Sequence, residues 1–125
     1  MNYLGLDYGT RHLGVALAAG PLAEPLTSVA TSEAFRILPR LIETHEVKSI
    51  IIGLAEGPVR QDLEKFIHRL KILGCPVITH EETLSTRDAI KSLLHTTKSR
   101  RKSREHSAAA ALILQSWLDS EHPRE

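Results

Sequence analysis

The sequence has one cysteine and no long hydrophobic run. Cys75 is the single cysteine among 125 residues, so no internal disulfide or cysteine-rich metal site can form, and a reducing compartment is expected. No run of about 18 apolar residues occurs, which argues against a membrane-spanning segment. The first apolar stretch follows no basic segment and is broken by Asp7. We therefore expect no secretory signal and a cytoplasmic protein.

Aromatic residues are also scarce. They make up 4% of the chain, so the core must consist mainly of leucine, isoleucine, valine and alanine, a composition suited to helices packed on a sheet. The length fits one compact domain. We expect this domain to span residues 1–119, with residues 120–125 as a flexible tail.

Positive charge is concentrated in one segment, although the net charge is only +1. Five cations fall within seven residues: Lys98, Arg100, Arg101, Lys102 and Arg104. The small net charge gives no global argument for a nucleic-acid partner. The local run indicates either an anionic partner or, as is common for such runs, a solvated loop.

Hydrophobic patterning predicts a mixed α/β order of elements. Strands are expected at residues 2–8, 12–19, 26–31, 48–54 and 75–79. Helices are expected from Ser32 as N-cap to Ile42, over 58–73, from Ser85 onward and over 105–118. Pro39 should kink the first helix or mark its start. Short connections make the first three strands an antiparallel meander, and the later crossovers add parallel strands to a sheet covered by helices.

Carboxylates at two strand ends are candidates for chemistry. Asp7 ends the first strand, where it can be held rigidly as a metal ligand, or it can simply accept turn hydrogen bonds. Glu81 and Glu82 follow the fifth strand. If both strands lie centrally in one sheet, one of these glutamates can converge with Asp7, since adjacent side chains point apart. The alternative is that both are solvated.

A histidine opens the last helix. His106 shares a helical face with Ala109, Ala110, Ile113 and Trp117, which should be the buried face, so His106 is expected to point toward the sheet. Small residues next to it would let the helix approach the sheet closely. Alone, such a histidine is more often a packed, hydrogen-bonded residue than a catalytic one.

Four segments resemble one known family. The segments are Leu4–Ala16, Ile51–Leu54, Glu81–Thr86 and Ser107–Asp119. They resemble, in order and at similar separations, the motifs of the YqgF family, also called RuvX, which groups pre-16S ribosomal RNA nucleases with Holliday-junction-resolvase-like proteins. The resemblance implies a ribonuclease H-like fold, with a five-stranded mixed sheet of three meander and two parallel strands and helices on both faces.

The resemblance also implies a carboxylate cluster that binds a divalent metal, Mg²⁺ or Mn²⁺. Asp7 is carried over as the first acid and Glu82 as the second, but the third acidic position holds His106. Histidine suits Mn²⁺ or Zn²⁺ better than Mg²⁺. Alternatively His106 is a general acid or base, Glu105 takes its place, or the site is inactive.

A second departure from the family is a short loop. The chain passes from Leu54 through residues 55–57 to Pro58, where the family has a longer segment, so any substrate contact made there is reduced. The nucleic-acid backbone is expected to contact the basic run and the first turn. The predicted contacts are Arg11, Lys98, Arg100, Arg101, Lys102 and Arg104.

These features predict a metal-dependent nuclease of structured nucleic acid, processing the 5′ end of pre-16S ribosomal RNA. One alternative is a Holliday junction resolvase, and another is a non-catalytic nucleic-acid-binding factor in ribosome assembly. The segment 7–10 also resembles the phosphate-binding hairpin of actin-like ATPases, but those enzymes need about twice this length. We expect a monomer or weak homodimer.

Overall fold

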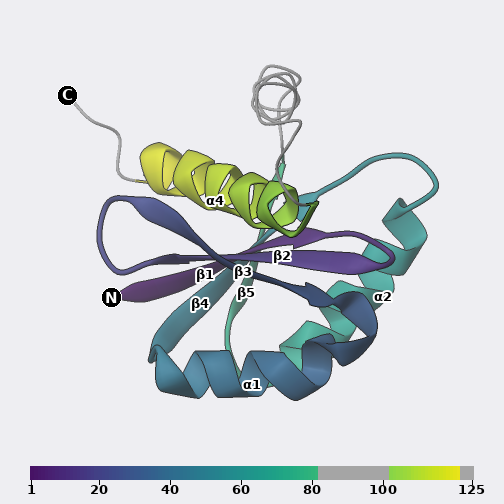
Figure 1. Ribbon diagram of the computed structural model, residues 1–125, viewed down its shortest axis with the longest axis horizontal. Coiled ribbons are helices and arrows are strands. Elements are labelled where there is room, and N and C mark those ends of the chain that lie inside the picture. The colour runs from purple at the N-terminus through teal and green to yellow at the C-terminus, as the bar shows by residue number, and fades with distance from the viewer. Residues whose placement is uncertain (82–101, 122–125) are drawn as a thin grey trace.

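A five-stranded mixed sheet lies at the centre of the molecule (Figure 1). The computed structural model describes residues 1–81 and 102–121, without the side chains of 102–105. The strands are β1 (Asn2–Tyr8), β2 (His12–Ala18), β3 (Ala23–Ala30), β4 (Val47–Leu54) and β5 (Val77–Glu81), in the order β3-β2-β1-β4-β5. β1, β2 and β3 pair antiparallel, and β4 and β5 continue the sheet in parallel. The predicted combination of meander and parallel strands is confirmed.

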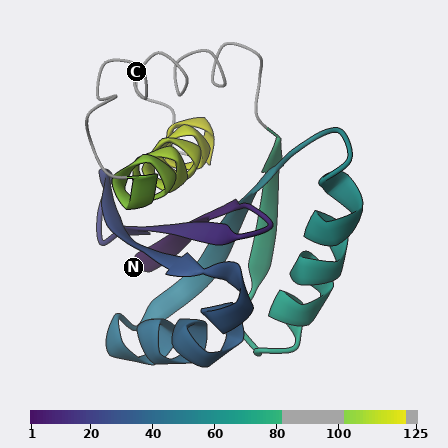
Figure 2. The same ribbon diagram turned by 45° about the vertical axis from the view of Figure 1, so that its right-hand side comes forward.

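Helices cover both faces of this sheet. The helices α1 (Ala34–Thr44) and α2 (Arg60–Lys71) lie on one face, and α4 (Lys102–Glu121) lies on the other (Figures 1 and 2). A short 3-10 turn, η1 (Thr31–Glu33), joins β3 to α1. The predicted helix from Ser85 lies outside the described residues. None of the helices in the described ranges is both long and apolar enough to span a bilayer.

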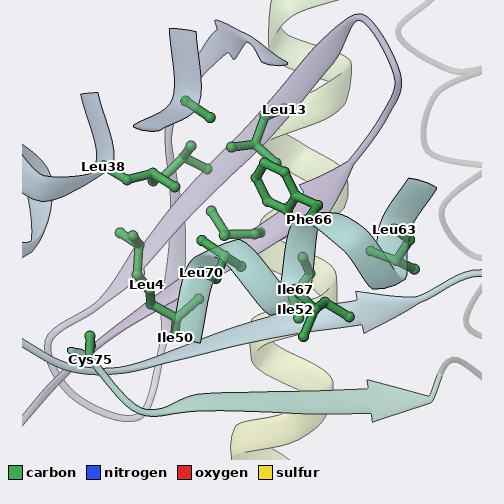
Figure 3. Packing of buried hydrophobic residues seen from close by; sticks show 13 residues of the cluster. Leu4, Leu13, Leu38, Ile50, Ile52, Leu63, Phe66, Ile67, Leu70 and Cys75 are labelled. Atoms are coloured by element: carbon green, nitrogen blue, oxygen red, sulfur yellow. The ribbon is translucent and has the colours of Figure 1, made fainter. Parts of the chain in front are cut away.

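The face covered by α1 and α2 holds the larger core. Alternate residues of the central strands point into it, such as Leu4 and Leu6 of β1 and Ile50 and Ile52 of β4 (Figure 3). Phe66 and Leu70 of α2 pack against them. β4 is buried on both faces, which explains its run of three isoleucines without polar alternation.

The opposite face is lined by small residues beneath α4. Ala16 and Ala18 of β2 are fully buried there. A Cβ added at Gly5 would lie 2.7 Å from the Cβ of Leu114 and 3.0 Å from the carbonyl oxygen of Ala110. The close approach expected for this helix is therefore confirmed, and it depends on small residues in the sheet as well as in the helix.

Polar contacts fix the C-terminal half of α4 on this face. The side chain of Gln115 accepts a hydrogen bond from the backbone nitrogen of Ala23 (2.8 Å) and donates one to the carbonyl of Pro21 (2.9 Å). Ser116 shares a hydrogen bond with His80 of β5 at 3.0 Å. Trp117 packs edge-on against Tyr3, with ring centroids 5.1 Å apart. The helix is thus held at both outer parts of the sheet.

Two predicted strands differ from those observed by more than one residue. β3 begins at Ala23 rather than at residue 26, and it includes Pro25 at a register shift opposite Ala16. β3 is an edge strand, and a proline at a bulge of an edge strand costs no ladder hydrogen bond. β5 spans 77–81 rather than 75–79 and lies at the opposite edge, so the condition that both carboxylate-bearing strands lie centrally in the sheet is not met.

Helix boundaries also differ. Ser32 is not the N-cap of α1, because it lies in η1 and no side chain caps either element; Pro39 lies inside α1 rather than at its start. α2 runs from Arg60 to Lys71, shorter than the predicted 58–73, and Gly74 follows it with a φ of +87°. The last helix starts three residues earlier than predicted and continues to Glu121.

Cys75 is expected to be protected from thiol reagents. Its side chain is buried against the backbone of β4, with the carbonyl of Lys48 3.6 Å from Sγ, and burial raises its pKa. Because the folded pKa exceeds the unfolded one, stability should fall as pH rises through the unfolded thiol pKa, about 8.5.

Because Cys75 is buried in the folded protein, Ellman's reagent should react more slowly with folded than with urea-unfolded protein. Equal rates in the two states would contradict the burial.

Candidate functional site

Asp7 lies on the face of the sheet that α4 covers. Gly5 contacts α4, and side chains alternate along β1, so Asp7, two residues later, faces the same side. Its side chain is half-buried and lies near the end of β1. On β2 its direct cross-strand partner is Gly14. The predicted placement of a carboxylate at a rigid strand end is thus observed.

Gly14 brings the first described turns of α4 next to Asp7. A Cβ added at Gly14 would lie 1.9 Å from the carbonyl oxygen of His106 and 2.3 Å from its carbonyl carbon. Only glycine permits this distance between β2 and the helix. The backbone of His106 therefore rests on the residue paired with Asp7.

The ring of His106 stacks on a second histidine. His12 begins β2, two residues before Gly14, and so lies on the same face of the sheet. The two imidazole centroids are 5.2 Å apart and the rings are inclined by 17°. His12 is exposed and His106 is half-buried. β2 therefore contacts both the backbone and the ring of His106.

The turn between β1 and β2 is tied down at several points. A Cβ at Gly9 would lie 2.7 Å from the carbonyl oxygen of His12, so glycine is needed for the tight turn. The hydroxyl of Thr31 donates a hydrogen bond to the carbonyl of Gly9 (2.7 Å), and its backbone nitrogen donates one to the carbonyl of Arg11 (2.9 Å). Arg11 is thus exposed on a fixed turn beside Asp7.

Tyr8 lies on the opposite face from Asp7. Its ring packs against Phe66 of α2, with centroids 4.9 Å apart. Burial raises the pKa of Tyr8, and the nearby carboxylate of Asp62 raises it further. Tyr8 is therefore a neutral packing residue under α2, on the other side of the sheet from Asp7 and His106.

The structure separates Glu81 from Asp7. Glu81 is the last residue of β5 rather than part of a following loop, and it is exposed. Ile78 packs in the core beneath α4, so Glu81, three residues later, faces the other side of the sheet from Asp7. β4 also lies between β5 and β1. Glu82 lies outside the described residues.

The predicted phosphate contacts are described only in part. Lys98, Arg100 and Arg101 lie outside the described residues. The backbones of Lys102, Arg104 and Glu105 belong to the start of α4, and their side chains are not described. This corrects the expectation that the whole basic run is a loop, since its last part begins a helix that leads directly to His106.

The described residues contain no complete metal-ligand set. Within residues 1–81 and the side chains from 106 to 121, no three histidine, cysteine, aspartate or glutamate side chains come together as ligands. Asp7 and His106 supply a carboxylate oxygen and an imidazole nitrogen on one face, a pair of donors that suits Mn²⁺. Both take part in further interactions. A complete set needs a donor from outside these residues.

Two residues of this cluster carry no predicted role from the sequence. The role of His12 depends on stacking with His106, and the role of Gly14 depends on the passage of α4 above it. Both features are contacts between segments that lie far apart in the sequence. A signal for their shared face does exist: Leu13 and Val15 are apolar, and alternation then places His12 and Gly14 together on the other side of β2.

The sequence matches known proteins along nearly its whole length. The family model described as "RuvX: Holliday junction resolvase" matches residues 1–120. A protein of Syntrophus aciditrophicus named "Putative pre-16S rRNA nuclease" is 38% identical, covering 96% of this chain and 89% of that protein. A protein of the same name in Geobacillus thermodenitrificans is 36% identical over 96% of this chain and 99% of its own.

Solved structures of resolvases share the fold. Thermus thermophilus RuvC in complex with a Holliday junction substrate superposes with a TM-score of 0.60 at 14% identity, covering 98% of this chain and 96% of that one. The fowlpox virus Holliday junction resolvase gives a TM-score of 0.59 at 13% identity, over 96% of this chain and 99% of the other. At these identities the likeness establishes the ribonuclease H-like architecture and nothing finer.

Proposed function

Because the chain belongs to the RuvX family, we propose that it is a metal-dependent endonuclease that processes the 5′ end of pre-16S ribosomal RNA. The observation that carries the proposal is the pairing of Asp7 with Gly14, on which the backbone of His106 rests. A strand-end carboxylate and the helix backbone that carries an imidazole are thereby brought to one face of the sheet. The proposal places the protein in the cytoplasm, together with precursor ribosomal RNA.

In this proposal Asp7, Glu82 and His106 hold the divalent ion, Mg²⁺ or Mn²⁺. Such an ion supplies Lewis acidity, which makes a bound water a better nucleophile and offsets charge on the phosphodiester. The outward position of Glu81 on the other face supports Glu82 as the second acid. Asp7 contributes a carboxylate on a rigid strand, and His106 contributes an imidazole fixed by β2, so neither has to reorganise when substrate binds.

Basic residues around the site would hold the flanking phosphates. Arg11 is exposed on the anchored turn next to Asp7 and is well placed to contact the nucleic-acid backbone. The run of Lys98, Arg100, Arg101, Lys102 and Arg104 immediately precedes His106 in the chain. Phosphate contacts of this kind give binding that weakens steeply with salt.

The proposal is tested by metal-dependent cleavage of a panel of substrates. A pre-16S RNA carrying its 5′ extension should be cut with Mn²⁺, while an unstructured RNA of the same length should be cut poorly. A four-way DNA junction belongs in the panel, because cleavage of the junction alone would identify a resolvase instead. Salt-sensitive RNA binding without any cleavage would favour a non-catalytic assembly factor and would overturn the proposal.

The substitution His106→Asp should change the preferred metal. Mg²⁺ prefers oxygen ligands, so the aspartate variant should gain activity with Mg²⁺ relative to Mn²⁺, by about 10-fold in the ratio of the two rates. His106→Ala should lose activity with both ions. The measurement is the initial cleavage rate at saturating metal. An unchanged Mg²⁺ to Mn²⁺ ratio in His106→Asp would remove His106 from the ligand set.

A further inference from the structure

The stacked pair of histidines gives His12 a role of its own. We propose that His12 is a positioning residue, which fixes the orientation of the His106 imidazole by ring stacking. The effect on cleavage rests on the proposed function, whereas the stacking itself does not. Both rings lie over the first half of β2, one from the strand and one from α4.

The geometry excludes a shared metal ligand set for the two rings. A metal bound by an imidazole nitrogen lies close to the plane of that ring, because the nitrogen lone pair lies in that plane. Two stacked rings inclined by only 17° have planes that meet far from either ring. His12 and His106 therefore cannot both bind one ion in this arrangement, and His12 acts through His106.

The contact with Gly14 positions the backbone of His106 but does not by itself set the torsions of its side chain. The ring of His12 restricts those torsions, and the strand that carries His12 also pairs with β1 through Gly14 and Asp7. The strand that pairs with Asp7 thus also contacts the ring of His106, and such outer contacts orient the ligands of a metal site.

His12 is placed to do this without being part of the core. It is exposed, at the first position of β2, and the adjacent turn is held by the hydrogen bonds from Thr31 to Gly9 and Arg11. The anchored turn holds the backbone of His12 in place beside the ring of His106. Replacing it should change the neighbouring ring more than the stability of the fold.

The test compares His12→Val with His12→Phe. Valine keeps the preference for a strand but removes the ring, while phenylalanine keeps an aromatic face for stacking. The imidazole resonances of His106, assigned from their loss in His106→Asp, should shift in His12→Val and stay close to wild type in His12→Phe. The Mn²⁺ concentration that half-broadens these resonances should rise about 10-fold or more in His12→Val and recover in His12→Phe.

Cleavage supplies the second readout. His12→Val should raise the half-activating Mn²⁺ concentration more than it lowers the rate at saturating Mn²⁺, and the exposed His68→Ala on α2 should change neither. Unchanged His106 resonances and an unchanged Mn²⁺ midpoint in His12→Val would overturn the proposal. If the wild type cuts no substrate but the resonances respond as expected, the proposed function fails and the positioning role of His12 stands.

Discussion

Replacement of Asp7 by asparagine is expected to reduce cleavage by at least about 10²-fold to 10³-fold while leaving the fold intact. The two side chains have nearly the same shape, so packing beneath α4 should be preserved. The change removes the negative charge that a divalent ion requires from its ligand. Asp7 is half-buried at the end of a central strand, so the surrounding backbone cannot shift to bring another metal ligand into its place.

The matched control is Asp62→Asn. Asp62 lies in the first turn of α2, on the other face of the sheet, and is exposed. Its replacement should cost only a few tenths of a kcal/mol, through the helix dipole, and should leave cleavage near wild type. Initial rates at saturating Mn²⁺ and thermal melting of both variants give the comparison. Wild-type rates in Asp7→Asn would place the active site elsewhere.

The central part of the sheet was predictable because burial leaves a clear mark there. The isoleucines of β4 and the alternating apolar residues of β1 and β2 have to be buried. Their pattern therefore identifies strands directly. Asp7 could be placed for the same reason, since the strand that carries it is well defined. The hydrophobic pattern of the edge strands is weaker.

β3 shows why the edges were misjudged. Glu24 and Pro25 look like loop residues, and a strand that is open to solvent on one edge tolerates both. The start of α4 was missed for a related reason. Lysine and arginine are good helix formers, so the basic residues before His106 are compatible with a helix as well as with a loop. The contact between Gly14 and His106, which places the helix over the sheet there, is not visible in the sequence.

The site itself was predictable in part. The sequence pattern gives the face of His106, because Ala109, Ala110 and Ile113 follow it at helical spacing and are buried. The partnership of His106 with His12 is a contact across about ninety residues of chain and depends on the register of β1 with β2. Local pattern does not carry that information, since a shift of one residue would turn His12 to the other face.

Gly14→Ala is expected to destabilise the protein by about 3 kcal/mol, at the upper end of the range for overpacking. The added methyl group would lie 1.9 Å from the carbonyl oxygen of His106. That oxygen belongs to a helix backbone, so no rotamer change relieves the clash, and α4 must shift away from β2. For a chain of this size the loss corresponds to a fall in Tm of roughly 10 °C.

The same shift should affect cleavage in molecules that remain folded. Moving α4 separates His106 from both Asp7 and His12, so the rate measured well below the Tm should fall along with stability. Gly20→Ala is the matched control, because a Cβ at Gly20 meets nothing within 4 Å, and its stability should stay within about 0.5 kcal/mol of wild type. Gly14→Ala with a wild-type Tm would mean that α4 does not rest on β2. A lowered Tm with full activity at low temperature would mean instead that catalysis does not need His106 to be held against β2.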